Sequence, residues 1–205
     1  MPALYSPATT RATLDPVLAT LQALRLPLPS QPLSVLARGI ISRTLRPVDL
    51  KRHVAFVSTP DEYGRTPLRF AVEVGSADIA HELLMLEANV NALDVNGTSP
   101  LHVAAAAGDY EMLGVLLLKA PDLEAFGPEG TPLLVACARM NWTAALLLLD
   151  RGASLTPTWG GKNALHWTVE RCCGARGDVV ARLCKVCLLI SRFKSVALMR
   201  VKIGH

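Results

Sequence analysis

Four of the five cysteines lie close together, and with a nearby histidine they form the most reactive set of side chains in the sequence. Cys172 and Cys173 are adjacent, Cys184 and Cys187 have C-x2-C spacing, and His166 lies just upstream. Thiolates and imidazoles bind zinc, but structural zinc sites place such pairs on turns, whereas the second pair here is expected inside a helix. Buried cysteines also serve as ordinary packing residues between helices. We therefore predict no metal, with a zinc or redox site as the alternative.

The remaining histidines and glycines do not form a recognisable catalytic set. A catalytic histidine needs a nucleophile or an orienting carboxylate beside it, and the sequence suggests none for His102 or His166. The segment WGGKNAL lacks the spacing of a phosphate-binding loop, and neither G-x-S-x-G nor H-E-x-x-H occurs. The sequence thus predicts a protein that is not an enzyme and has no cofactor.

Composition points to a helical protein with an uneven charge distribution. Of the 205 residues, 51% are hydrophobic but only 5% are aromatic, which favours small side chains packed between helices. Residues 61–156 contain five basic and thirteen acidic side chains, while both flanking segments are basic and the net charge is +4. The acidic middle argues against nucleic acid and favours a protein partner with a basic or mixed-charge surface. An odd number of cysteines, no evident secretory signal and no long apolar run predict a cytoplasmic or nuclear protein without a transmembrane segment.

The sequence repeats itself with a period of 33 residues. The segment DEYGRTPLRFAVEVGSADIAHELLMLEANVNAL, which begins at Asp61, aligns with DVNGTSPLHVAAAAGDYEMLGVLLLKAPDLEAF, which begins at Asp94. A third copy begins near Gly127 and is one residue shorter, and a looser fourth copy begins near Thr158. A unit of this length that recurs in tandem is typical of a solenoid.

Each unit is predicted to form two helices separated by a tight turn. In the second copy, Ser99 can cap a helix that begins at Pro100, and Gly108 tolerates the left-handed turn that ends it. A second helix then carries an apolar stripe at helical spacing, made of Met112, Leu113, Leu116 and Leu117. Such a pair buries its apolar faces only against neighbouring copies.

The motif TSPLHVAAAAG with the 33-residue period resembles the ankyrin repeat family. The resemblance implies an all-α solenoid of stacked helix-turn-helix units joined by β-turn loops, and a histidine that bonds the backbone between repeats. Arg69 and Leu134 replace this histidine, and Glu87 and Met140 replace later glycines. In the fourth copy, Asn163 and Ala164 replace the Thr-Pro pair, so the second copy is expected to be the best-formed unit.

We divide the chain accordingly, with less regular segments at both ends. The predicted parts are an N-terminal amphipathic helix and Pro-rich linker (1–29), a degenerate capping repeat (30–60), repeats at 61–93, 94–126 and 127–157, a degenerate fourth repeat (158–190), and a basic-apolar tail (191–205). The apolar stripe of the first helix comprises Leu14, Val17, Leu18, Leu21 and Leu24. A mitochondrial import sequence is the alternative for this N-terminal part.

Two alternative functions arise near the C-terminus. Residues 180–189 resemble the elongin-binding helix of a SOCS box, a module of ubiquitin-ligase receptors, because Val180, Cys184 and Leu188 have the matching spacing. Val179 departs from that pattern and the expected downstream Pro-Leu segment is missing, so an outer ankyrin helix is the simpler interpretation. The tail at 191–205 alternates apolar and basic residues, as segments that bind acidic lipid surfaces do.

The family resemblance implies a scaffold or adaptor that grips another protein with its turn tips and the exposed side of its inner helices. The tip positions are Tyr63, Arg65, Asn96, Glu129 and Trp159. The inner-helix positions, all expected to be exposed, are Glu73, Val74, Ala106, Ala107, Asp109, Arg139, Asn141, Glu170 and Arg171. Tyr, Trp and Arg often dominate interfaces, although Trp159 can instead stack on Trp167.

Overall fold

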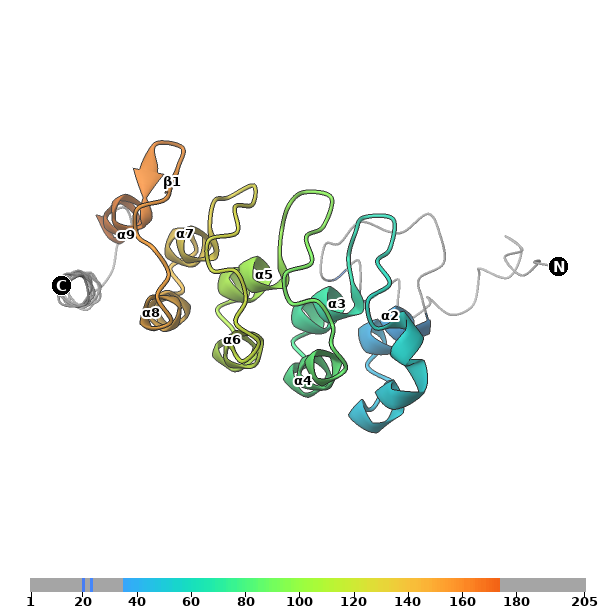
Figure 1. Ribbon diagram of the computed structural model, residues 1–205. Helices are drawn as coiled ribbons and strands as arrows, with labels where there is room; N and C mark the ends of the chain where they lie inside the picture. The colour runs from blue at the N-terminus through green and yellow to red at the C-terminus, as the bar shows by residue number, and fades with distance from the viewer. Residues whose placement is uncertain (1–19, 21–22, 24–34, 174–205) are drawn as a thin grey trace, which may run out of the picture.

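The computed structural model describes residues 20, 23 and 35–173, and the structural statements below concern these residues. They form helix pairs stacked in one row (Figure 1). In chain order the pairs are α2 (Val35–Ile41) with the 3-10 helix η1 (Pro47–Phe56), α3 (Pro67–Val74) with α4 (Ala77–Met85), α5 (Pro100–Ala107) with α6 (Tyr110–Leu117), and α7 (Pro132–Ala138) with α8 (Trp142–Asp150). A two-stranded hairpin, β1 (Thr158–Trp159) and β2 (Lys162–Asn163), then leads into α9 (Ala164–Cys173).

The helices α3, α5 and α7 begin in the same way. Thr66, Ser99 and Thr131 each accept a hydrogen bond from the backbone N–H three residues later, and each is followed by a proline at the start of the helix. The cap satisfies one of the free N–H groups of the first turn, and proline has no N–H to satisfy there. The predicted cap at Ser99 and helix start at Pro100 are therefore confirmed.

A left-handed residue ends each of these helices and turns the chain towards the second helix. Gly75 and Gly108 have φ values of 72° and 71°, and Met140 adopts 62° at the equivalent position. Such angles cost a non-glycine residue about 1 kcal/mol, because its Cβ approaches the backbone. The third repeat thus keeps the backbone of the second one although its sequence lacks the glycine.

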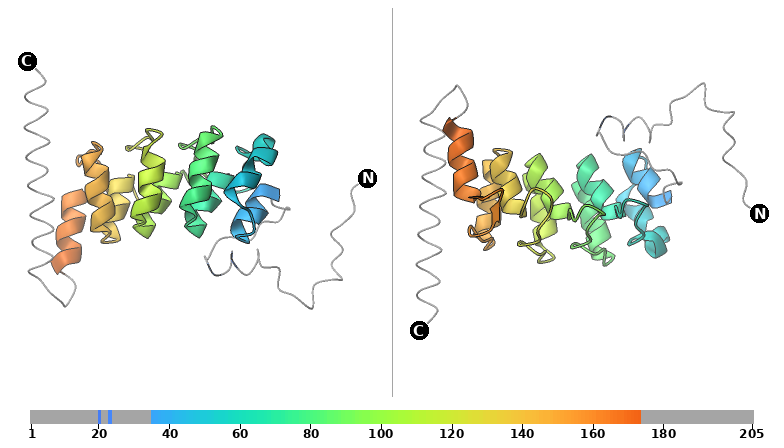
Figure 2. Two further views of the ribbon diagram at one scale, coloured as in Figure 1. Left: turned by 90° about the horizontal axis from the view of Figure 1, so that it is seen from below. Right: turned by 90° about the horizontal axis from the view of Figure 1, so that it is seen from above.

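The helices form two layers, which Figure 2 shows from below and above. The inner layer contains α2, α3, α5, α7 and α9, each packed against the next, and the outer layer contains η1, α4, α6 and α8. Ala104 and Ala105 of α5 are fully buried, as are Met112, Leu113 and Leu116 of α6. Small side chains let inner helices approach closely, and each buried leucine contributes roughly 2 kcal/mol of transfer free energy. The predicted apolar stripe of the second helix is confirmed.

The pair formed by α2 and η1 continues both layers at the N-terminal side. Leu36, Ile40 and Ile41 of α2 and Leu50 of η1 are fully buried, and the two helices pack against α3 and α4. This pair lies within the segment for which a capping unit is predicted. Its side chains complete the core of the first repeat.

Several predicted features lie outside the described residues. They are the helix and linker at 1–29 (apart from Thr20 and Ala23), the fourth unit beyond residue 173, the segment 180–189 and the tail 191–205. Within the part of the chain that the structure describes, no helix is long and apolar enough to cross a membrane.

Candidate protein-binding surface

The turns that precede the inner helices project on one side of the row, and we call them fingers (Figure 1). In the second finger, the Asp94 carboxylate accepts hydrogen bonds from the backbone N–H groups of Asn96 (2.9 Å) and Thr98 (2.8 Å). Asp61 makes the same two bonds in the first finger. An aspartate that holds its own turn in this way fixes the finger locally.

All four fingers have backbone hydrogen bonds across the turn, and the third and fourth lack the aspartate. Gly127 and Gly130 exchange two backbone hydrogen bonds of 2.9 and 3.1 Å, and Trp159 pairs with Lys162 in the β1–β2 hairpin. Gly127 replaces the aspartate of the earlier fingers. The paired residues Gly127 and Gly130 are three apart, whereas Asp94 and Thr98 are four apart, so the third copy is one residue shorter here.

Neighbouring fingers are joined, and they expose apolar side chains. The Val95 N–H donates to the Tyr63 carbonyl across the first two fingers at 3.0 Å. Leu93, Val95 and Phe126 are 52%, 65% and 58% exposed, and we call these three residues the finger patch. Apolar side chains held open to solvent on a fixed backbone are typical of a protein-binding surface. None of the three is among the predicted binding residues, although an apolar residue within an otherwise polar turn is a sequence signal for such a surface.

The predicted binding residues divide by exposure into three groups. Four are exposed (Asn96, Ala107, Arg139 and Glu170), seven are partly buried (Tyr63, Glu73, Ala106, Asp109, Glu129, Asn141 and Trp159), and two are buried (Arg65 and Val74). The side chain of Arg171 lies outside the described residues.

Arg65 is a correction to the predicted surface. It is only 3% exposed, and its guanidinium pairs with Asp61 at 2.7 Å. The same group lies 4.9 Å from the ring centres of both Tyr63 and Phe70. A cation held between two rings and a carboxylate stabilises the first finger, so Arg65 is not open to a partner.

Glu73 and Val74 are also not exposed, contrary to the prediction. The Glu73 side chain is 6% exposed and accepts a 2.7 Å hydrogen bond from Arg69, which also pairs with Asp94 at 3.2 Å. Burial raises the pKa of Glu73, and the nearby Arg69 opposes that rise. Val74 is 6% exposed.

Asp109 and Asn141 have structural roles at the turns between inner and outer helices. Asp109 caps α6 by accepting from the Met112 N–H at 3.0 Å. The Asn141 amide donates to the carbonyls of Ala105 (2.9 Å) and Ala106 (2.7 Å), and so ties the third repeat to the second. Their partial burial follows from these bonds, because each bond draws the polar end of the side chain towards the backbone.

Arg139 and Glu129 form an exposed ion pair next to the finger patch. One guanidinium nitrogen of Arg139 lies 2.8 and 3.1 Å from the two carboxylate oxygens of Glu129, and the side chains are 52% and 41% exposed. The pair joins the end of α7 to the third finger. Exposed pairs of this kind contribute little stability, so both charges are available to a partner.

His102 ties the second repeat to the third. Its Nδ1 accepts from the Ser99 N–H at 3.2 Å, so Nε2 carries the proton and donates to the Gly130 carbonyl at 3.0 Å. Burial lowers the pKa of His102, against the effect of its backbone hydrogen bonds. At the equivalent position of the preceding repeat, Arg69 donates to the Thr98 carbonyl at 3.3 Å. The structural role predicted for His102 is confirmed, and Arg69 supplies the same tie between the first and second repeats.

Comparison with known families agrees with this geometry. A model of ankyrin repeats, in three copies, matches residues 50–126. This part of the chain belongs to the ankyrin repeat family. No curated protein gives a significant match to the chain. The pair α7–α8 and the helix α9 continue the ankyrin array beyond the matched residues, with the same inner-layer packing. Ankyrin repeats generally mediate protein–protein binding, and the comparisons identify no catalytic domain.

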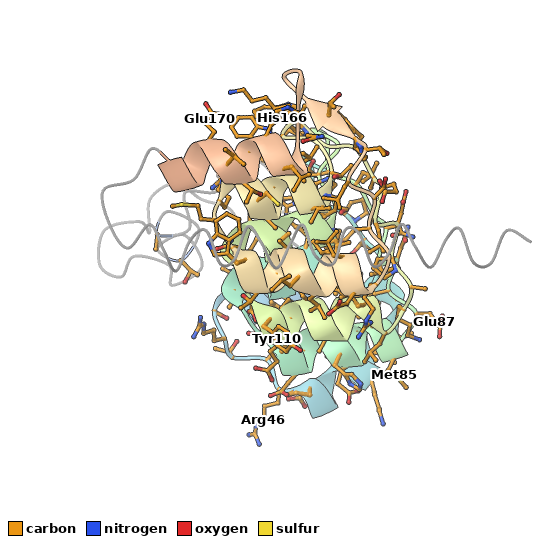
Figure 3. The ribbon with its side chains drawn as sticks, turned by 90° about the vertical axis from the view of Figure 1, so that its left-hand side faces the viewer. Arg46, Met85, Glu87, Tyr110, His166 and Glu170 are labelled. Carbon is orange, nitrogen blue, oxygen red and sulfur yellow. The ribbon has the colours of Figure 1, made fainter. Side chains whose placement is uncertain are left out.

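Trp159 lies at the last finger of the ankyrin array and stacks on Trp167. The ring centres are 5.3 Å apart with an interplanar angle of 30°, and Lys162 lies 5.0 Å from the Trp167 ring. This is the structural alternative given above for Trp159. Figure 3 shows His166 and Glu170 on α9, where both side chains are exposed.

The described part of the array contains no cluster of His, Cys, Asp and Glu able to hold a metal ion. Cys184, Cys187 and the side chains of Cys172 and Cys173 are outside that part, so the zinc alternative stays untested. Cys137 is a free thiol in the core, where burial raises its pKa to about 11. A thiol with that pKa is almost entirely protonated at neutral pH, and it is a poor nucleophile.

Proposed function

We propose that the chain is a non-enzymatic adaptor of the cytoplasm or nucleus, which binds a protein partner through the finger patch and the adjoining charged side chains. The observation that carries this proposal is the exposure of Leu93, Val95 and Phe126 on fingers fixed by backbone hydrogen bonds. A rigid apolar surface loses little conformational entropy when it binds, and this favours affinity.

The charge of the array supports a partner with a basic or mixed-charge surface. Residues 61–156 carry thirteen acidic and five basic side chains. Arg65 and the Glu73 side chain are engaged within the first repeat, and Arg69 bridges the first and second repeats. The charges open to a partner next to the patch include the Glu129–Arg139 pair. An apolar centre with a charged rim is typical of protein interfaces.

The test is affinity purification with a matched pair of double variants. Val95→Asp with Phe126→Asp places charges in the finger patch. Met85→Asp with Leu118→Asp places the same charges at the ends of outer helices, at side chains that are 57% and 67% exposed. We expect proteins that bind the wild type and the outer-helix variant, but not the finger variant, in quantitative mass spectrometry. Equal recovery with all three proteins would show that the finger patch is not the binding surface.

The alternative functions depend on residues outside the described part and remain predictions. Recruitment to an elongin-containing ubiquitin ligase through 180–189 predicts co-purification of elongin. Association with acidic lipid through 191–205 predicts liposome binding that is lost when this tail is deleted.

A further inference from the structure

One side of α9 is open at a place where the earlier inner helices are covered by the next repeat. Val169 has the position in α9 that Ala105 has in α5 and Cys137 has in α7. Ala105 and Cys137 are fully buried, and Cys137 lies against Thr168 of the following inner helix. Val169 is 49% exposed. This side of α9 therefore has the form of a surface that packs against another helix.

His166 is also open. It has the position of His102, which is 3% exposed and bonds the Gly130 carbonyl of the next repeat at 3.0 Å. The Nδ1 atom of His166 lies 2.6 Å from the side-chain oxygen of Asn163, so the local contact of the motif histidine is present. No described residue bonds its Nε2 atom, and the side chain is exposed on α9 (Figure 3).

The open side of α9 continues onto the β1–β2 hairpin and forms a hollow of about 590 Å³, which we call the α9 hollow. Its described lining consists of Lys162, Asn163, Leu165, His166, Val169 and Glu170. Leu165 and Val169 are one helical turn apart and form the apolar part of the lining. The Lys162 Nζ lies 2.6 Å from a carboxylate oxygen of Glu170, and the two side chains are 41% and 53% exposed.

The α9 hollow is complementary to itself in polarity and in charge. When a second copy of α9 lies antiparallel to the first, with the two-fold axis close to His166, Leu165 of each helix faces Val169 of the other. The same register places Lys162 of each copy near Glu170 of the other, because one residue precedes the axis and the other follows it. Every contact then occurs twice, as in a two-fold symmetric interface. The charges of Lys162 and Glu170 cancel within each copy, so the two surfaces do not repel one another.

We propose that the α9 hollow binds a second copy of the chain in an antiparallel, two-fold symmetric dimer. Contact between Leu165 and Val169 of the two copies removes apolar surface from water, and Lys162 and Glu170 exchange their partners across the axis. A contact made by one helix and one hairpin of each copy is small, so we expect a dissociation constant of roughly 10–100 µM.

The dimer has a consequence that rests on the proposed function. The α9 hollow shares no residue with the finger patch, so one dimer presents two finger patches. A partner with two binding sites would then bind the dimer more tightly than the monomer. The dimer itself is measured without any partner, so its failure is distinguishable from failure of the finger patch to bind.

Sedimentation velocity of the full chain tests the apolar contact, at concentrations below and above the expected dissociation constant. A reducing buffer ensures that no disulfide joins the copies. We expect the wild type to shift from monomer to dimer as its concentration rises. Val169→Asp should weaken the dimer at least about tenfold, because it places a charge in the apolar contact of both copies. Met85→Asp is the matched control, since Met85 is 57% exposed on the outer helix α4, and it should dimerise as the wild type does.

Mixing two charge variants tests the antiparallel register. Lys162→Glu and Glu170→Lys each place like charges together in a dimer of their own kind, so each alone should be mainly monomeric. In a mixed dimer, the two negative charges of the first variant meet the two positive charges of the second. We therefore expect the mixture to associate at least about tenfold more tightly than either variant alone. Mixing cannot restore a pair within one chain, so this gain reports contact between copies.

Three results would overturn the proposal. They are a wild type that stays monomeric at every concentration, a dimer that Val169→Asp does not weaken, and a mixture that associates no better than its components. A monomer whose melting temperature falls with Val169→Asp but not with Met85→Asp would identify other residues of the same chain as the cover, and it would also refute the dimer.

Discussion

Replacement of His102 by leucine is the sharpest test of how the repeats are held together. The change leaves an apolar side chain of similar size at a position where the third repeat already has Leu134. It removes the tie to the Gly130 carbonyl and the acceptor for the Ser99 N–H. His166→Leu is the matched control, because His166 has the same place in the fourth repeat but is exposed.

The expected cost follows from the bonds that each group loses. The Gly130 carbonyl keeps its bond from the Gly127 N–H, so only one of its two bonds disappears, at a cost of about 1 kcal/mol. The Ser99 N–H is buried and loses its acceptor, which costs roughly 1–3 kcal/mol. We therefore expect His102→Leu to lower the free energy of unfolding by about 2–4 kcal/mol, and His166→Leu to lower it by less than about 0.5 kcal/mol.

The same variant tests the ionisation of His102. Burial lowers the pKa of the folded histidine below 6.5, so the unfolded chain takes up a proton first as the pH falls. The folded state of the wild type therefore loses stability as the pH falls from about 6.5 towards the lowered pKa, and His102→Leu removes this part of the dependence.

Urea unfolding followed by circular dichroism, at several pH values between 5 and 8, measures both effects. The other four histidines are present in both proteins, so the difference between the two pH profiles reports His102. A loss below about 0.5 kcal/mol at pH 7.5, or identical pH profiles, would refute the assignment of a neutral, bridging histidine.

Three further predictions concern the core and the turns. Gly130→Ala should destabilise more than Gly152→Ala in thermal unfolding: both residues have φ near 90°, but an added Cβ meets a Leu134 methyl at 2.6 Å only in the first case. Asn141→Ala should cost about 1–3 kcal/mol through two lost hydrogen bonds, whereas Thr143→Ala at an exposed site should cost little, and equal effects in urea would contradict the bridging role. Cys137 should resist thiol reagents at pH 8 in the native protein and react on unfolding, because burial raises its pKa to about 11; rapid native labelling would argue against its burial.

Most of the fold could be predicted from the sequence because its determinants are local. The cap at Ser99, the proline that follows it and the left-handed turn at Gly108 each depend on a few adjacent residues, and the structure has all three. The period of 33 residues then repeats this unit, and apolar residues at helical spacing must face the neighbouring copies.

The candidate surface was predicted less well because exposure depends on residues from other repeats. Arg65 is at a finger by sequence, yet Asp61, Tyr63 and Phe70 enclose it. Conversely, Leu93 and Phe126 are apolar residues within polar turns, but the packing of neighbouring repeats decides that both remain open to solvent.

The sequence by itself therefore determined the repeat, the helix pairs and their caps, since short-range hydrogen bonds and helical periodicity fix these. Only the tertiary structure decided that Arg69 bonds the next repeat, as His102 does one repeat later. The Thr98 carbonyl comes within reach of Arg69 only when the repeats stack. It also decided that Val74 is buried while Ala107 is exposed. Burial depends on tertiary contacts and not on the neighbouring residues in the sequence.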